Sequence, residues 1–369
     1  MSGLDTKSAL LKNIQTAIEN LIIADQQSTN AFVITDKLRH DILNLLVTYS
    51  EQIPHPASGT GNSDDGHEKE DKKNANTLIR WQVLAYVSSI DLTIAKWFES
   101  HLDALSILHE VGYDKSTQGL WAVWAAEGHP QPIQYQQGKI SGTKAWCSGA
   151  HIVDHALMTY RDGSGQSQLV VVDMAQDGIE IDNSEWQAVG MQGTDTATVE
   201  FDEVIACNVG AANVYLDRVG FWHGAAGVAA CWYGATASLA TYLIKGYQQK
   251  PNDYKAMYLG QISTALSVTQ QYFYHVSDLI DTQANSSHEL IIRQLRANVE
   301  QLAREVLETV GQALGAAPFC RNAHFAKLSA DLPVFIRQSH GAFDLQKIGE
   351  LSSILANESI TLQENIWQL

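Results

Sequence analysis

His340 and His223 are the two side chains in this sequence that we single out as candidate proton acceptors. A neutral imidazole accepts a proton near pH 7, which makes histidine a common general base. His340 directly precedes Gly341, a position that also suits a helix C-cap or a surface histidine. His223 follows two aromatic residues at the expected start of a long helix. Which of them acts as a base depends on where the fold places each ring.

Neither the closely spaced histidines nor the cysteines form a metal or redox motif. His151 and His155 are four residues apart, but they lie in an expected strand region, where this spacing does not place two ligands on one helical face. The four cysteines contain no CxxC pair, so the sequence predicts neither a zinc ribbon nor a redox dithiol. We expect no bound metal, and buried free thiols in a reducing compartment.

Charge and hydropathy restrict the class of partner. The chain has 369 residues and a net charge of −17, and 45% of its residues are hydrophobic. Nucleic acid and anionic membrane surfaces attract basic patches, so neither is expected as a partner. The N-terminus has no basic segment followed by an apolar one, and no apolar run approaches the ~20 residues that a membrane span needs. We therefore expect a cytoplasmic protein.

Both ends of the chain are predicted to be helical, and the two candidate bases lie in the second helical part. Apolar residues recur at helical spacing in the first part of the chain, and Thr35 is a candidate helix cap. A polar stretch rich in helix breakers, 55–73, predicts a surface loop. The helical period returns at Val219 in an alanine-rich segment, and long periodic runs then predict a helix bundle. These runs cover residues 259–281, 288–314 and 325–337.

The middle of the chain has a different period. Residues 121–126 are a strand candidate, and two β-rich runs, 156–160 and 169–174, are separated by the turn sequence RDGSG at 161–165. Residues 196–201 alternate between polar and apolar side chains. These features predict a small antiparallel sandwich or barrel of about a hundred residues between the two helical parts.

We therefore predict an α+β multidomain chain with an N-terminal helical domain, a central antiparallel β domain and a C-terminal four-helix-type bundle. The expected ranges are 1–115, 116–215 and 216–369. The alanine-rich, apolar helices of the last part have more hydrophobic surface than one small core requires, so we expect a homo-oligomer, a dimer or a tetramer.

Four segments resemble motifs of the acyl-CoA dehydrogenase superfamily, in the order in which that family carries them. Residues 140–149 (ISGTKAWCSG) resemble its G-x-K-x-W strand, and residues 190–196 (GMQGTDT) resemble its loop of the type G-M/W-R-G/A-S-D/T. Residues 200–204 (EFDEV) resemble its V-F-E-D-V strand, and residues 312–315 (QALG) resemble its Q-x-x-G-G turn. The resemblance covers nearly the whole chain.

The resemblance implies a bound FAD. On this reading Trp146 packs on the isoalloxazine ring, Ser148 bonds near its N5, and the strand from Trp124 to Ala126 offers backbone groups to its pyrimidine edge. Gln312 and Gly315 would face the dinucleotide tail, from a neighbouring subunit. The alternative is that Trp124 and Trp146 are aromatic residues of the β-domain core.

The sequence departs from the family at the residues that carry its chemistry. The family's catalytic glutamate is missing from both of its usual locations, which correspond here to residues 330–341 and 219–247. The family's serine-containing loop and its arginine turn are also replaced, by residues 127–132 and 248–254. His340 is then the nearest candidate base for an α-proton, and His223 is the second.

The resemblance thus implies an oxidoreductase that acts on the CH–CH group of an acyl thioester. A flavin monooxygenase of class D type, on the same fold, is one alternative, because that branch keeps the flavin site without the glutamate. A non-catalytic relative that has lost its flavin is the other alternative.

Overall fold

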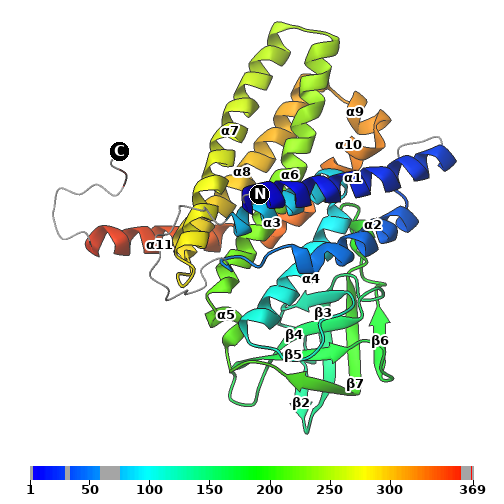
Figure 1. Cartoon of the computed structure of the whole chain (residues 1–369), viewed down its shortest axis with the longest axis vertical. Helices are drawn as coiled ribbons and strands as arrows, with labels where there is room; N and C mark the ends of the chain where they lie inside the picture. Colours follow the sequence, from blue (N-terminus) through cyan, green and yellow to red (C-terminus); the bar gives the residue numbers. More distant parts are fainter. Residues whose placement is uncertain (1–2, 30–33, 59–74, 359–366, 368–369) are drawn as a thin grey trace.

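The computed structural model describes residues 3–29, 34–58, 75–358 and 367 (Figure 1). The first part of the chain is helical, as its periodicity predicts, and Thr35 caps its second helix by accepting a hydrogen bond from the Leu38 amide at 3.2 Å. Most of the expected loop, residues 59–73, lies outside the described residues. The helices are α1 (Gly3–Thr29), α2 (Asp36–Tyr49), η1 (Ser50–Gln52), α3 (Asn76–Ile90) and α4 (Leu92–Glu110).

The central part forms a seven-stranded sheet in the order β1-β4-β5-β7-β3-β2, with β6 also paired to β7. The long strand β7 joins the two halves, because it pairs with β3 and β6 along its first part and with β5 at residues 206–208. The strands are β1 (Trp121–Trp124), β2 (Gln134–Gln136), β3 (Lys139–Cys147), β4 (His155–Arg161), β5 (Ser167–Asp173), β6 (Ile179–Asp182) and β7 (Ala197–Asn208), with η2 at Gln192–Thr194.

One strand pair differs from the antiparallel arrangement that we expected. β1 pairs with β4 in parallel, with Trp121 opposite His155, so the sheet is mixed. A parallel pair needs a long connection, and the chain between these strands includes β2 and β3, which gives it that length. The α+β fold class is confirmed. The three-domain division stays a prediction, with its boundaries between α4 and β1 and inside the short helix α5 (Val214–Asp217).

The last part is again helical. Long helices rise away from the β strands, which occupy the lower part of the view in Figure 1, while α3 and α4 lie between the two. The helices are α6 (Gly220–Gln249), α7 (Asp253–Thr282), α8 (Glu289–Leu314), α9 (Ala317–Arg321), α10 (Ala323–Phe335), η3 (Ile336–Gln338) and α11 (Ala342–Glu358).

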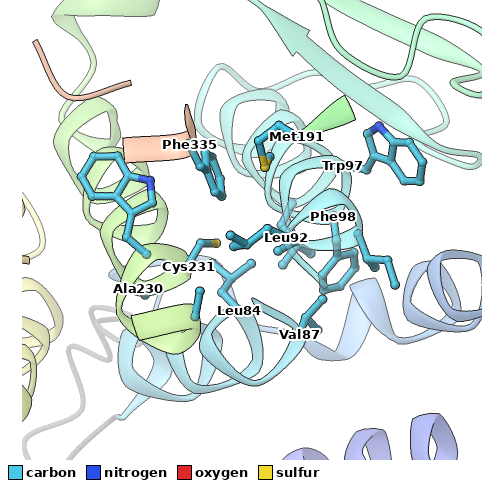
Figure 2. Packing of buried hydrophobic residues seen from close by; sticks show 14 of the residues in the cluster. Leu84, Val87, Leu92, Trp97, Phe98, Met191, Ala230, Cys231 and Phe335 are labelled. Carbon is cyan, nitrogen blue, oxygen red and sulfur yellow. The ribbon is translucent and has the colours of Figure 1, made fainter. Parts of the chain in front are cut away.

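The main hydrophobic core joins the helices to the β domain. Leu84 and Val87 of α3 and Leu92 of α4 pack with Cys231 of α6 in the centre of Figure 2. Met191, from the loop before η2, and Phe335, at the end of α10, belong to the same core. The core is therefore continuous from the bundle to the β domain, and it fixes how the two parts meet.

Two further features of the described residues concern chemistry and location. All four cysteines are free thiols: Cys147 and Cys231 are buried, Cys207 is half-buried and Cys320 is exposed. In the part of the chain that the structure describes, no helix combines the length and the apolar character that crossing a membrane requires.

Candidate functional site

A cavity of about 660 Å³ lies where the β domain meets the helices, and we call it the main cavity. The segment from Val123 to Ala126 forms one wall, and the end of β3 forms another. The loop before η2 contributes Met191, and the end of α10 with η3 closes the opposite side. Segments far apart in the sequence thus surround one space.

Trp146 is the most unusual residue of this cavity. Its backbone has a φ of 63°, in the left-handed region that a non-glycine residue rarely adopts. It lies at a register irregularity of β3 against β7, between Lys144 and Cys147. The indole is 67% exposed and meets the edge of Trp186, with 6.5 Å between ring centroids. A large aromatic face held in strained backbone and left uncovered indicates a binding platform.

Hydroxyl groups lie beside this platform. The Ser148 hydroxyl and the Thr196 hydroxyl are 2.8 Å apart, and Thr196 in turn lies 3.0 Å from the Thr194 hydroxyl. The Trp124 indole N–H donates to the Ser148 carbonyl at 3.2 Å, which ties the β1 wall to the end of β3. The cavity therefore presents a short chain of hydroxyls that can donate to or accept from a polar ligand edge.

The β1 wall is fixed on helix α4 by two hydrogen bonds. The Val123 amide donates to the Ser100 hydroxyl at 2.8 Å, and the Trp121 amide donates to His101 Nδ1 at 3.1 Å. Burial lowers the pKa of His101 to about 4, so its ring is neutral and its Nδ1 is free to accept this bond. The segment that reaches Ala126 is thereby held rigidly against the helix.

The opposite wall is clamped to the β domain by a buried carboxylate. Asp331 of α10 accepts the Met191 amide at 2.6 Å and the Lys327 ammonium at 2.5 Å. Burial raises the pKa of Asp331, while Lys327 lowers it. Pro333 lacks an amide hydrogen, and two residues later α10 ends and η3 begins. This break brings Arg337 and the following residues to the cavity.

The structure brings five of the residues expected from the sequence around this one cavity: Trp124, Ala126, Trp146, Ser148 and His340. Their roles stay predictions. Sequence reasoning did not single out Thr194, Thr196, Lys96 or Arg337, which also line it. The two threonines lie in the quoted motif GMQGTDT, whose hydroxyl residues were the available signal.

His223, Gln312 and Gly315 lie elsewhere. His223 lines a separate cavity of about 420 Å³, with its Nε2 3.0 Å from the Ser286 carbonyl oxygen. Burial lowers the pKa of His223 to about 4. Gln312 and Gly315 are exposed at the end of α8, and the Gln312 amide donates to Glu308 at 2.7 Å. None of these three residues lines the main cavity.

A second space, the inner chamber, adjoins the main cavity and has a volume of about 630 Å³. Lys96, Val123, Gln338 and His340 line both spaces, and we call this shared boundary the neck. Helix α4 contributes further polar side chains to the chamber at i, i+3, i+4 and i+7. These are Lys96, Glu99, Ser100 and Asp103, a polar stripe whose helical spacing the sequence could have revealed.

Comparison with known proteins shows which family the middle of the chain matches and which solved structures share its fold. Residues 132–204 match the family described as acyl-CoA dehydrogenase, middle domain. A sequence search against curated proteins finds no match. The predicted resemblance to the acyl-CoA dehydrogenase superfamily is confirmed, because the middle of the chain matches that family and the solved structures below share the fold of the whole chain.

Three solved structures illustrate the shared fold at low sequence identity. TdsC from Paenibacillus sp. A11-2, solved with FMN and indole, has a TM-score of 0.72 and 14% identity, over 92% of this chain and 96% of that one. Butyryl-CoA dehydrogenase from Megasphaera elsdenii has a TM-score of 0.72 and 14% identity, over 94% and 98%. Nitrososynthase from Micromonospora carbonacea var. africana has a TM-score of 0.70 and 13% identity, over 94% and 96%.

Proposed function

We propose that this chain, a divergent member of the acyl-CoA dehydrogenase-like superfamily, is a flavin-dependent oxidoreductase. The observation that carries the proposal is Trp146, an exposed indole in strained backbone on the wall of the main cavity. A flat heteroaromatic ring is the ligand that such a platform suits, because offset stacking and area burial both favour it.

The rest of the main cavity fits a flavin. Ser148 and Thr196 supply hydroxyls for the polar edge of the ring system. Lys96 and Arg337 line the cavity, and no aspartate or glutamate is found among its described lining residues. An anionic phosphate therefore meets cations rather than carboxylates. A flavin bound here would supply two-electron oxidation of a substrate or, once reduced, activation of dioxygen.

One reaction compatible with this site is dehydrogenation of the CH–CH group of an acyl thioester. It requires a base for the α-proton, and His340 lies at the neck of the main cavity, where its imidazole can take that proton. Butyryl-CoA dehydrogenase, which has the same fold, supports this reading by analogy.

The charge of the inner chamber favours the second reaction, oxygenation of a small polar molecule by a flavin monooxygenase. Four cationic and four carboxylate side chains line the chamber beside apolar ones such as Phe221, Trp222 and Val228, and an acyl chain bound there would remove water from the charged groups. TdsC, a dibenzothiophene monooxygenase, shares the fold and supports the oxygenation reaction by analogy. We therefore place oxygenation ahead of acyl dehydrogenation. If this chain bound no flavin, the result would favour the remaining alternative, a non-catalytic relative that has lost its flavin.

Flavin binding is the first test. We expect the purified protein to bind FAD or FMN and to be stabilised by it through mass action. Trp146→Ala removes the platform and is expected to weaken flavin binding about tenfold or more. Ser148→Ala is expected to weaken it less than Trp146→Ala but more than His340→Ala. Fluorescence titration measures each dissociation constant.

The control for this test is Ile205→Ala, which removes an apolar side chain that is 66% exposed on β7, away from the main cavity. Its flavin affinity should equal that of the unmodified protein. If neither FAD nor FMN changed the melting temperature of the wild-type protein, the proposed function would be contradicted.

We propose FAD rather than FMN as the flavin. The support is the segment with Gln312 and Gly315, which resembles the family's dinucleotide-contacting turn and is exposed at the end of α8, where a neighbouring subunit can use it. Gln312→Ala is then expected to weaken FAD binding several-fold and to leave FMN binding unchanged. Parallel titrations with the two flavins check this, and an equal effect on both would contradict the assignment.

We further propose a cytoplasmic homo-oligomer, a dimer or a tetramer, that acts on a small molecule. Exposed apolar side chains on α7 support the oligomer, because Tyr254, Met257 and Val268 are 75%, 56% and 63% exposed. We expect sedimentation at micromolar concentration to give at least twice the monomer mass of 40.6 kDa. A monomer under these conditions would remove this part of the proposal.

A further inference from the structure

The inner chamber contains carboxylates in two different situations. Two of them are engaged by Arg293: its Nε donates to Glu289 at 2.8 Å, and its Nη1 pairs with Asp344. Asp344 also accepts the His340 amide at 3.2 Å. Both carboxylates thus already have a guanidinium partner, and Asp344 also has an amide donor.

Glu99 and Asp103 are in the opposite situation, because each has a cation at 3.8 Å and no hydrogen bond from a described residue. Glu99 is the more buried of the two, with 7% of the residue exposed, and its side chain lines the chamber. Among the described residues no hydrogen bond reaches its carboxylate, and the nearest cation is the Lys96 ammonium at 3.8 Å, an ion-pair distance that is too long for a hydrogen bond. A buried carboxylate without a donor is costly, so a ligand in the chamber that offers a proton or an N–H or O–H group would be favoured there.

Charged groups on three helices face Glu99. Burial raises the pKa of Glu99 to about 7, while Lys96, Arg80 and Arg296 lower it and Asp103 raises it further. Lys96 and Asp103 are on α4 itself, Arg80 is on α3, and Arg296 is on α8. The Tyr215 hydroxyl of α5 and the Cys231 thiol of α6 also face Glu99, and burial raises the pKa of both groups. A group that changes its charge near neutral pH can both accept and return a proton.

The geometry points to Glu99 as a catalytic residue that accepts a proton from a substrate in the inner chamber, a role that rests on the proposed function. An O–H bond forms on the Glu99 carboxylate as an X–H bond of the substrate breaks, where X is oxygen, nitrogen or carbon, and the electron pair stays on X. The negative charge left on X lies near Lys96, which also lines the main cavity. For acyl dehydrogenation, a carboxylate from α4 would thus take the place of the glutamate that is missing from residues 219–247 and 330–341.

The test uses phenol as the probe, with the full-length protein, both without and with added FAD. Phenol is a small ring with one O–H group, and it stays neutral below pH ~9, as the tyrosine side chain does. Calorimetric titrations from pH 5.5 to 8.5 give its dissociation constant. We expect the affinity to rise about tenfold as the pH passes through about 7, because the ionised Glu99 accepts a charge-assisted hydrogen bond from the phenol.

Glu99→Gln should bind phenol with an affinity that does not change with pH. Glu289→Gln removes the same charge from the same chamber at a carboxylate already paired with Arg293, so it should keep the wild-type profile. His340 also lines the chamber, and a histidine could cause a pH dependence of its own. His340→Asn tests that alternative, and this variant should keep the wild-type dependence of phenol affinity on pH. Circular dichroism checks that each variant is folded.

Several results would overturn the assignment: no phenol binding by the folded protein, a flat profile in the wild type, the same profile in Glu99→Gln, or loss of the profile in His340→Asn. Because the titration without FAD needs no flavin, it decides the role of Glu99 independently. Failure of FAD to bind would instead remove the proposed function.

Discussion

Gly234→Ala is expected to destabilise the protein by about 3 kcal/mol, because the new methyl group has no space. Gly234 lies on α6 where it crosses α3, and a Cβ atom built there comes within 2.6 Å of the Cα and C atoms of Ala85. These are backbone atoms, so the two helices would have to move apart. That movement would also open the core between α3, α4 and α6, next to the inner chamber. Chemical denaturation with urea measures the loss.

The matched control is Gly260→Ala, which makes the same change in the exposed middle of α7, where a Cβ atom meets nothing within 4 Å. Alanine is the better helix former, so this variant is expected to gain about 0.5–1 kcal/mol. If both variants lost stability equally, the close approach of α3 and α6 would not be the cause.

Glu99→Gln is expected to stabilise the protein at pH 8 by about 3 kcal/mol and to have little effect at pH 4. The pKa of Glu99 is raised to about 7 in the folded protein from an ordinary value of 4.5. A proton therefore binds the folded state more tightly than the unfolded state. The stability that this proton contributes is fully present below about pH 4.5 and is lost as the pH rises through about 7. Glutamine resembles the protonated carboxyl group and does not titrate, so it avoids that loss.

Thermal unfolding of the two proteins between pH 4 and pH 8 measures this difference, which should appear as a gap of several degrees in Tm that opens with rising pH. Glu200→Gln, a change at an exposed glutamate of β7, should leave the pH profile of the wild type unaltered. A constant gap between Glu99→Gln and the wild type at every pH would contradict the raised pKa of Glu99.

The residues around the Trp146 platform could be selected from local sequence. Trp146 and Ser148 lie in the contiguous motif 140–149, and Trp124 lies in the strand predicted at 121–126. Short patterns were therefore enough to single them out, and the fold brings them around one cavity, while their roles stay predictions. The strain at Trp146 was not visible, because a φ of 63° results from the register irregularity between β3 and β7 and not from residue type.

The base could not be chosen in the same way. His340 and His223 are the same residue type at comparable positions near helix ends, yet one lies at the neck between the main cavity and the inner chamber and the other lies against Ser286 in a separate cavity. The burial that lowers the pKa of His223 to about 4 is produced by the packed protein around it. Residue type sets the ordinary pKa, and only the environment sets the actual one.

By itself, the sequence determined the helical character of both ends of the chain and the strand character of its middle, since hydrophobic period and cap residues such as Thr35 act within a few residues of chain. It also contains the motifs that resemble the acyl-CoA dehydrogenase superfamily, and residues 132–204 match that family's middle domain. The tertiary structure alone decided that β1 and β4 run parallel and that α4 brings Glu99 to a chamber with Arg296 of α8. These facts depend on contacts between residues far apart in the chain, where both the distance between charges and their exclusion from water come from packing.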